Sequence, residues 1–323
     1  YTRSGITGTG TASVSLSGAT DIAGNAITAT PVSGASFPVD NTTPKAYIEY
    51  SPSSKVKTGN IITFTAIFSE PISEFSTPLI TSTAPESFSN ISMTRIDETH
   101  YTYLRTIASA GNGNSTITLS GAKDFAGNTV TATPTSGNLL VVDNAKPSAS
   151  ISYSPPGPYA SGKNITISAT FNEALAETPV PTISITGANI LEPAGMTKID
   201  STHFKIDYTV SAGNGAANII LGAATDPVGN VILAAPASGG SFIVDNNPLT
   251  ITFAALASDN SYIDISFSEG VFGAEDGETP VLASCFNLIF ASNGGTATGA
   301  VIASATNTSG NPLMGGEKTI RLN

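Results

Sequence analysis

Cysteine and charged residues are scarce in this sequence and tryptophan is absent, and these shortages limit the kinds of protein that it can form. Cys285 is the only cysteine, so no disulfide can form within the chain. It lies in the apolar run VLASCFNLIF, and we expect it to be buried. Charged residues make up only 11% of the chain, too few for helices with surfaces rich in ion pairs. The net charge of −11 argues against nucleic acid as a partner and suits divalent cations better.

Long apolar runs are missing as well. No stretch of 18 or more apolar residues occurs, so we expect no membrane span in this segment. The residues from Tyr1 onward show neither the basic nor the apolar region of a signal peptide. We therefore expect the chain to be a segment of a longer protein.

The residues that are abundant are typical of β-structure. Hydrophobic residues make up 40% of the 323 positions, enough to bury cores, and 31 glycines and 20 prolines supply many turns. Threonine, serine and isoleucine are frequent, and no segment shows sustained helical spacing. This composition predicts an all-β protein.

Four short motifs recur along the chain, mostly at intervals of 103 or 102 residues. The pattern Asp-x-x-Gly-Asn begins at Asp21, Asp124 and Asp226, and Val-Asp-Asn contains Asp40, Asp143 and Asp245. Phe-Ser/Asn-Glu contains Glu70, Glu173 and, after a shorter interval, Glu269, while MTRIDETHY matches MTKIDSTHF around His100 and His203. Because such a period is that of a whole domain, we predict units at 1–44, 45–145, 146–247 and 248–323, the first and last incomplete.

The unit at 45–145 contains seven short strand patterns. Alternating or apolar runs occur at 46–51, 60–69, 78–82, 88–96, 100–107, 115–122 and 138–142. Asn112-Gly113 is a strong signal for a hairpin turn. Seven strands in about 100 residues predict an immunoglobulin-like sandwich, although the paired cysteines and core tryptophan of antibody domains are absent. The predicted fold class is therefore all-β, with tandem immunoglobulin-like antiparallel sandwiches in a rod.

These motifs together resemble a known family. The segments VDNTTP and VDNAKP, the FSEP after an early strand and the DxAGN before the last strand look like bacterial immunoglobulin-like repeats. The resemblance implies a sandwich fold, an extracellular place (cell surface or secreted) and, in some members, calcium between domains. The third unit departs from the pattern with DPVGN and VDNNPL, and the fourth matches only through FSE.

The recurrent Asp-x-x-Gly-Asn has two interpretations. A type I turn favours aspartate first and glycine fourth, and asparagine tolerates left-handed geometry, so the motif needs no metal. A metal site is the alternative, because 11 of only 24 acidic residues occupy repeat-equivalent positions. Clustered carboxylates repel one another unless they are protonated or bind a cation.

The expected topology brings these positions together. In a seven-stranded sandwich the loops after the second, fourth and sixth strands return to the end where the preceding linker enters. The candidate metal ligands at these ends are Asp40, Asn41, Glu70, Asp97, Asp124, Asn128, Asp143, Asn144, Glu173, Asp200, Asp226, Asn230, Asp245 and Glu269. Calcium takes six to eight oxygen ligands, whereas zinc prefers cysteine and histidine, so we expect calcium.

These patterns predict a structural role. We expect a stalk segment of a bacterial surface or secreted adhesin, stiffened by calcium at the junctions between repeats. The alternative is an accessory region, a spacer or a polysaccharide-binding part, of a secreted multidomain enzyme. The chain itself is expected not to be an enzyme, since His100 and His203 recur beside a turn. Its expected partners are neighbouring repeats, with host or surface polysaccharide or protein ligands bound through other domains.

Overall fold

The computed structural model describes residues 5, 7–274, 277–291, 294, 296 and 299–323. Parts of the predicted units 1–44 and 248–323 lie outside these residues. In the described part of the chain, the only helix is the short 3-10 turn η1 (Ala283–Cys285), and all other regular elements are strands. None of its helices has the length and apolar character needed to cross a membrane. The predicted class of antiparallel immunoglobulin-like β-sandwiches is confirmed.

The first sandwich is built from strands β3 to β11. One sheet has the order β3 (Ala46–Ser51), β5 (Ile61–Phe68), β9 (His100–Thr106) and β8 (Thr94–Arg95). The other has the order β4 (Lys55–Val56), β11 (Leu139–Val142), β10 (Gly113–Ser120), β6 (Leu79–Ser82) and β7 (Phe88–Ser92). All pairs are antiparallel except β4 with β11. The very short β4 escaped the sequence prediction because two residues show no alternation.

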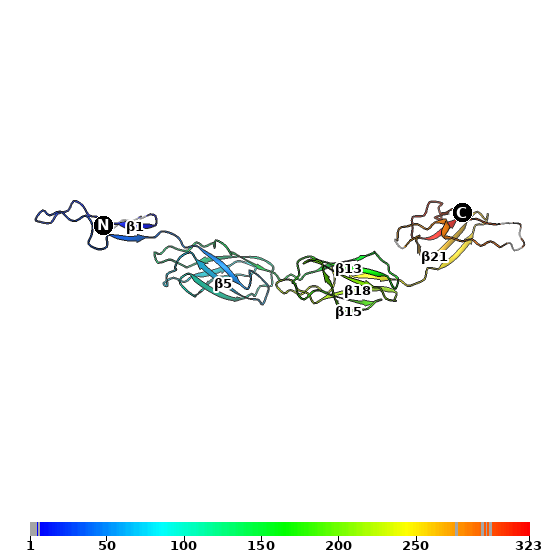
Figure 1. Ribbon diagram of the computed structural model, residues 1–323, viewed down its shortest axis with the longest axis horizontal. Coiled ribbons are helices and arrows are strands. Elements are labelled where there is room, and N and C mark those ends of the chain that lie inside the picture. The colour runs from blue at the N-terminus through cyan, green and yellow to red at the C-terminus, as the bar shows by residue number, and fades with distance from the viewer. Residues whose placement is uncertain (1–4, 6, 275–276, 292–293, 295, 297–298) are drawn as a thin grey trace. The chain divides into compact units, whose positions relative to one another are not determined.

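The second sandwich repeats this plan with strands β12 to β19. One sheet has the order β12 (Ala149–Ser154), β13 (Asn164–Phe171), β17 (His203–Thr209) and β16 (Thr197–Lys198). The other has the order β15 (Leu191–Gly195), β14 (Thr182–Gly187), β18 (Gly215–Gly222) and β19 (Ser241–Val244). Each sheet takes its strands from one sandwich alone, as the ribbon also shows (Figure 1).

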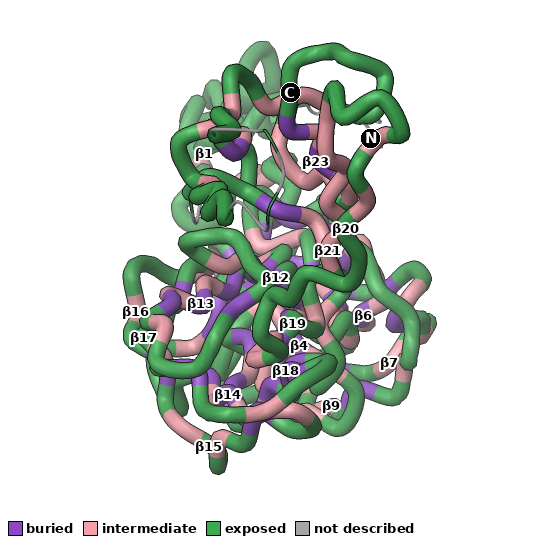
Figure 2. The backbone as a smooth tube through the Cα atoms, turned by 90° about the vertical axis from the view of Figure 1, so that its right-hand side faces the viewer, coloured by how far each residue is buried: buried purple, intermediate pink, exposed green. Residues whose placement is uncertain are grey.

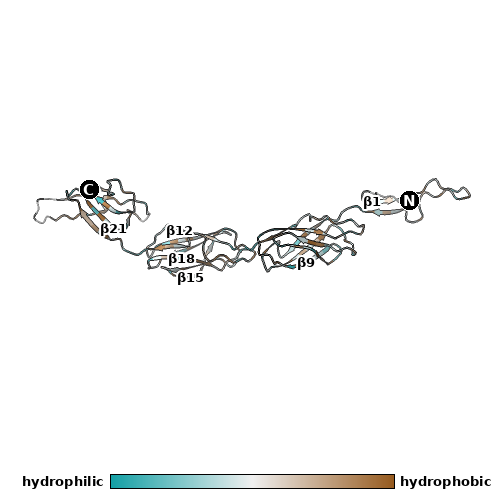
Figure 3. Cartoon of the chain, turned by 180° about the vertical axis from the view of Figure 1, so that it is seen from behind, coloured by the Kyte–Doolittle hydropathy of each residue, from teal (hydrophilic) through white to brown (hydrophobic). Residues whose placement is uncertain are grey.

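Alternating burial explains how each pair of sheets encloses a core. Along β5 every second side chain is buried, including Ile62 and Phe64, and β13 repeats this with Ile165 and Ile167. Successive strand residues point to opposite faces, so one face of each sheet lies on the core. The tube in Figure 2 shows buried positions on the strands and exposed ones in the loops, and Figure 3 shows hydrophobic stretches on the strands.

The ends of the chain carry smaller assemblies. Near the start, β1 (Gly10–Ser13) pairs with β2 (Ser36–Val39), and both are mostly exposed. Towards the end, one sheet has the order β20 (Ile251–Leu256), β21 (Ile263–Val271), β23 (Glu317–Leu322) and β22 (Ala305–Thr306). The chain divides into two compact units, one of residues 1–158, 162–211 and 215–244, the other of 159–161, 212–214 and 245–323. The division into four repeats remains a prediction.

Two local predictions were wrong. Cys285 is exposed, because it lies in η1 while Val281 of the same run packs into the small core with Ile320. Asn112-Gly113 is not a hairpin turn, because β9 and β10 belong to different sheets and the segment crosses between them. The Asn112 side chain instead accepts a hydrogen bond at 2.5 Å from the backbone N–H of Asn144.

Candidate metal centres

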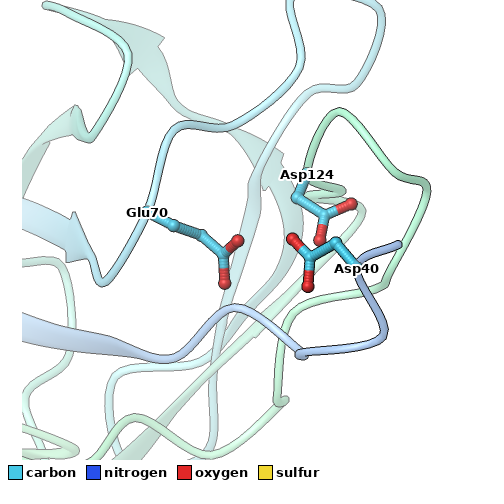
Figure 4. Close-up of side chains that lie close together, drawn as sticks. All are labelled: Asp40, Glu70 and Asp124. Atoms are coloured by element: carbon cyan, nitrogen blue, oxygen red, sulfur yellow. The ribbon is translucent and has the colours of Figure 1, made fainter. Parts of the chain in front are cut away.

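Three carboxylates that are distant in sequence meet at one end of the first sandwich. Asp40 follows β2, Glu70 follows β5, and Asp124 lies in the connection from β10 to β11. One oxygen from each lies within 4.8 Å of the others, with Asp124 buried and the other two half-buried. Figure 4 shows the three side chains projecting towards one another from three separate segments. We call them the first carboxylate group.

The second sandwich carries an equivalent set, the second carboxylate group. Asp143 follows β11, Glu173 follows β13, and Asp226 lies in the connection from β18 to β19. Their oxygens also lie within 4.8 Å of one another, and Asp226 is buried as Asp124 is. The structure thus brings together the two trios of acids that the repeat comparison places at these ends. Either group could hold a metal ion.

The Asp-x-x-Gly-Asn motif forms the same turn in all its copies. At Asp124, Oδ1 accepts the backbone N–H of Asn128 at 2.8 Å and Oδ2 accepts the Asn128 amide at 2.8 Å. Asp226 and Asn230 make the same two bonds, both at 2.8 Å. Gly127 has a φ of +94°, a left-handed conformation that favours glycine. The turn interpretation is therefore correct as local structure. Oδ2 of each of these two aspartates accepts only the asparagine side chain and keeps a further lone pair for a cation.

The asparagine of this turn also holds the preceding linker. Asn128 Nδ2 donates to the backbone carbonyl of Asp40 at 3.0 Å, and Asn230 Nδ2 donates to that of Asp143 at 2.9 Å. Both asparagines were candidate oxygen ligands, yet they present amide N–H groups to the linker. They position the linker aspartate beside the other two acids, which is a supporting role.

The asparagine of Val-Asp-Asn points back to the repeat that it leaves. Asn144 Oδ1 accepts the backbone N–H of Thr58 at 2.8 Å, and its Nδ2 donates to the carbonyls of Ser109 and Gly111. Asn41 Nδ2 likewise donates to the carbonyl of Gly8 at 2.6 Å. Neither belongs to a carboxylate group. In the first two copies of Val-Asp-Asn, then, the aspartate side chain joins a carboxylate group of the following sandwich, and the asparagine side chain bonds to residues that precede it in the chain.

Asp97 and Asp200 lie in the turns before β9 and β17 and belong to neither group. Asp97 Oδ1 accepts the backbone N–H groups of Thr99 and His100, each at 2.7 Å, and contacts His100 Nδ1 at 3.0 Å. The Thr99 N–H, followed by the His100 ring, holds the pKa of Asp97 well below its usual range. The recurring Asp-His pair is thus part of the turn before the strand.

Glu98 is a further acidic residue close to the first group, and it lines the same hollow as Asp40. The comparison of repeats missed Glu98 because the equivalent position in the next repeat is Ser201.

The third predicted junction differs. Asp245 Oδ1 accepts the backbone and side-chain N–H groups of Asn247 at 3.0 and 2.9 Å. Glu269 lies on β21. Among the residues that the structure describes, neither acid belongs to a group of three.

The pKa values of Glu70 and Glu173 are raised by burial and by the neighbouring negative charges. Burial raises the pKa of Glu70, and the charges of Asp40 and Asp124 raise it further. Burial likewise raises the pKa of Glu173, with additional repulsion from Asp143 and Asp226, whereas Lys55 lowers it. A cation at either group would relieve this repulsion.

Comparison with known proteins adds little. No protein-family model matches the sequence, and no curated protein matches it. Among solved structures, a marsupial T cell receptor is similar at 12% sequence identity, over 86% of this chain and 93% of that chain, with a TM-score of 0.24. The fold assignment therefore depends on the strands and sheets of this chain.

Proposed function

We propose that this chain is a stalk segment of a bacterial surface or secreted adhesin, with calcium fastening each linker to the sandwich that follows. One observation carries the proposal: two equivalent carboxylate groups each combine one linker aspartate with two loop acids of the next sandwich. A cation bound there would cross-link segments that the chain connects only through a linker. Stiffening the array is the consequence.

The donor set favours calcium. All three side chains of each group are carboxylates, and calcium is a hard cation that accepts carboxylate, carbonyl and water oxygens. Zinc would favour histidine or cysteine, and neither residue belongs to a group. Extracellular calcium modules commonly bind at about 10⁻⁴–10⁻³ M. Three ionised carboxylates exceed the charge of one calcium ion, so affinity in this range or tighter is expected.

The bacterial extracellular assignment rests on the sequence motifs and their order. Val-Asp-Asn after a last strand, Phe-Ser-Glu after an early strand and Asp-x-x-Gly-Asn before the last strand all resemble bacterial immunoglobulin-like repeats. The array of sandwiches supports a spacer role. We propose no catalytic role for His100 or His203, because each interacts with the aspartate of its own turn.

We expect Glu70→Gln to have opposite effects with and without calcium. The variant keeps the shape of the side chain and removes one ligand charge, so calorimetry should show one calcium site fewer than in the wild-type chain. In EDTA its melting temperature at pH 7 should rise, because repulsion from Asp40 and Asp124 is gone. Burial and the charges of Asp40 and Asp124 raise the pKa of Glu70 in the folded state, so lowering the pH through that pKa should protonate Glu70 and bring the metal-free wild type towards the variant.

The exposed acid Glu192 on β15 provides the matched control. Glu192→Gln should leave both calcium binding and the EDTA melting temperature unchanged. If the wild-type chain binds no calcium at millimolar concentration, the carboxylate groups are products of turn geometry alone and the calcium proposal is wrong.

A second candidate function is a polysaccharide-binding accessory region of a secreted enzyme. Phe125, with 67% of its surface exposed, lines the hollow beside the first carboxylate group. Exposed aromatic rings provide stacking surfaces for ligands. If this function holds, Phe125→Ala should abolish retention of the chain in affinity electrophoresis through polysaccharide gels. If the wild-type chain and Phe125→Ala each migrate equally far with and without polysaccharide, neither binds it, and the stalk is the preferred function.

A further inference from the structure

Two lysines, Lys55 on strand β4 and Lys57 just after it, distinguish the second carboxylate group from the first. Lys55 Nζ lies 2.9 Å from Asp143 Oδ2, where the aspartate side chain is 14% exposed and the lysine 42%. Lys57 Nζ donates at 2.5 Å to the carbonyl of Gly229, inside the turn that contains Asp226. Both contacts run from the first sandwich to the linker or the second sandwich. The second group therefore already faces a positive charge supplied by the chain.

In the part of the chain that the structure describes, the first group has no such partner. Among the described residues, no lysine, arginine or histidine nitrogen lies within 4.0 Å of a carboxylate oxygen of Asp40, Glu70 or Asp124. The lysines are not a general feature of the repeat either. Moving 103 residues along the chain places Pro158 and Ala160 where Lys55 and Lys57 stand. Two groups of the same geometry thus differ in their counter-charge.

We propose that Lys55 is the resident cation of the second carboxylate group, competing there with a divalent cation. This inference rests on the proposed calcium function for its competition step. The ammonium group of Lys55 neutralises part of the charge at Asp143, so the linker stays attached to the first sandwich without metal. A calcium ion must displace it, so the second group binds calcium more weakly than the first. The flexible, half-exposed lysine side chain can turn away when calcium enters.

An incidental surface ion pair is the simple alternative, because exposed pairs contribute little to stability. Three observations favour the resident cation. The Asp143 side chain is mostly buried, and the linker backbone is held beside the pair by the bond from Asp143 N–H to the carbonyl of Val56 at 2.7 Å. Lys57 adds an attachment to the turn at Asp226, whose Asn230 side chain bonds to the carbonyl of Asp143. The hydrogen bond that Lys55 Nζ donates to Asp143 also raises the pKa of Lys55.

Hydrogen exchange of the full chain in EDTA tests whether Lys55 holds the linker when no metal is bound. Lys55→Met keeps the length of the side chain and removes its charge, and Lys55→Arg restores the charge. In Lys55→Met the amides of 143–145 and 226–230 should exchange several-fold faster, while Lys55→Arg should match the wild type. Lys205→Gln, at an exposed position on β17, is the matched control and should change nothing. Equal exchange in Lys55→Met and wild type overturns the proposal.

Calcium titration of the same variants tests the competition. Lys55→Met should bind calcium at the second group about tenfold more tightly than wild type, a difference of 1.4 kcal/mol. The first group should be unaffected. Unchanged affinity at the second group overturns the competition. If neither group binds calcium in any variant, the calcium function fails, and the competition fails with it. The exchange experiment still decides whether Lys55 holds the linker.

Discussion

Replacing Glu86 with alanine is expected to destabilise the first sandwich by about 3–5 kcal/mol, because it removes one partner of a buried ion pair. Only 1% of the Glu86 surface is exposed. Its carboxylate accepts from Arg105 Nε at 2.6 Å and Nη2 at 2.5 Å, and from the backbone N–H groups of Ala108 and Ser109 at 3.1 and 2.8 Å. Alanine leaves all four donors without this acceptor, and chemical denaturation of the full chain should detect the loss.

The second sandwich shows which residue pair could replace Glu86 and Arg105. At the equivalent positions, 103 residues later, Asn189 and Tyr208 replace Glu86 and Arg105. Asn189 Oδ1 accepts from the Tyr208 hydroxyl at 2.9 Å and from the backbone N–H of Ser211 at 2.7 Å. A neutral hydrogen-bonded pair, Asn189 with Tyr208, therefore occupies the place that the charged pair Glu86 with Arg105 has in the first sandwich.

We expect the double change Glu86→Asn with Arg105→Tyr to recover most of the stability that Glu86→Ala loses. Glu86→Asn alone should recover less, since it leaves the Arg105 charge without its partner. Glu49→Ala, at an exposed position on β3, controls for the loss of a surface carboxylate. A Glu86→Ala variant as stable as Glu49→Ala would show that this pair is not needed for the fold.

Asp226→Ala is expected to destabilise the second sandwich by about 2–4 kcal/mol when measured in EDTA, because buried donors lose a charged acceptor. Asp226 is 1% exposed, and its carboxylate accepts from the backbone N–H groups of Val228 and Asn230 at 2.9 and 2.8 Å. It also orients the Asn230 amide that donates to the carbonyl of Asp143. Loss of Asp226 should therefore loosen the linker as well as the turn.

The chain offers a matched control for this prediction in its first copy of the motif. Asp21 accepts from the backbone N–H groups of Ala23 and Asn25 at 2.9 and 2.8 Å, and from the Asn25 side chain at 2.8 Å, but it is exposed. Asp21→Ala should leave the thermal unfolding of both sandwiches unchanged, because water can replace the lost acceptor. Equal losses for Asp21→Ala and Asp226→Ala would contradict the role of burial.

Much of the candidate site follows from repetition along the chain. The interval of 103 residues singled out Asp40, Glu70 and Asp124, and alternating topology placed their loops at one end. Position in the repeat could not show the direction of each side chain. Asn128 and Asn144 occupy repeated positions, as ligands would, yet one holds the linker backbone and the other the preceding sandwich. Both use N–H donors, a detail that depends on which groups lie opposite them in space.

The sequence by itself determined the all-β class, the strands with alternating burial such as β5 and the turn at Asp-x-x-Gly-Asn. Each of these depends on local periodicity or on the conformational freedom of one glycine, and such information lies within a few neighbouring residues. Only the tertiary structure decided that Lys55 meets Asp143, that Glu86 is buried against Arg105 and that Cys285 is exposed. These outcomes depend on which surfaces pack together, because burial and pairing are set by atoms distant in sequence and not by the residue's own neighbours.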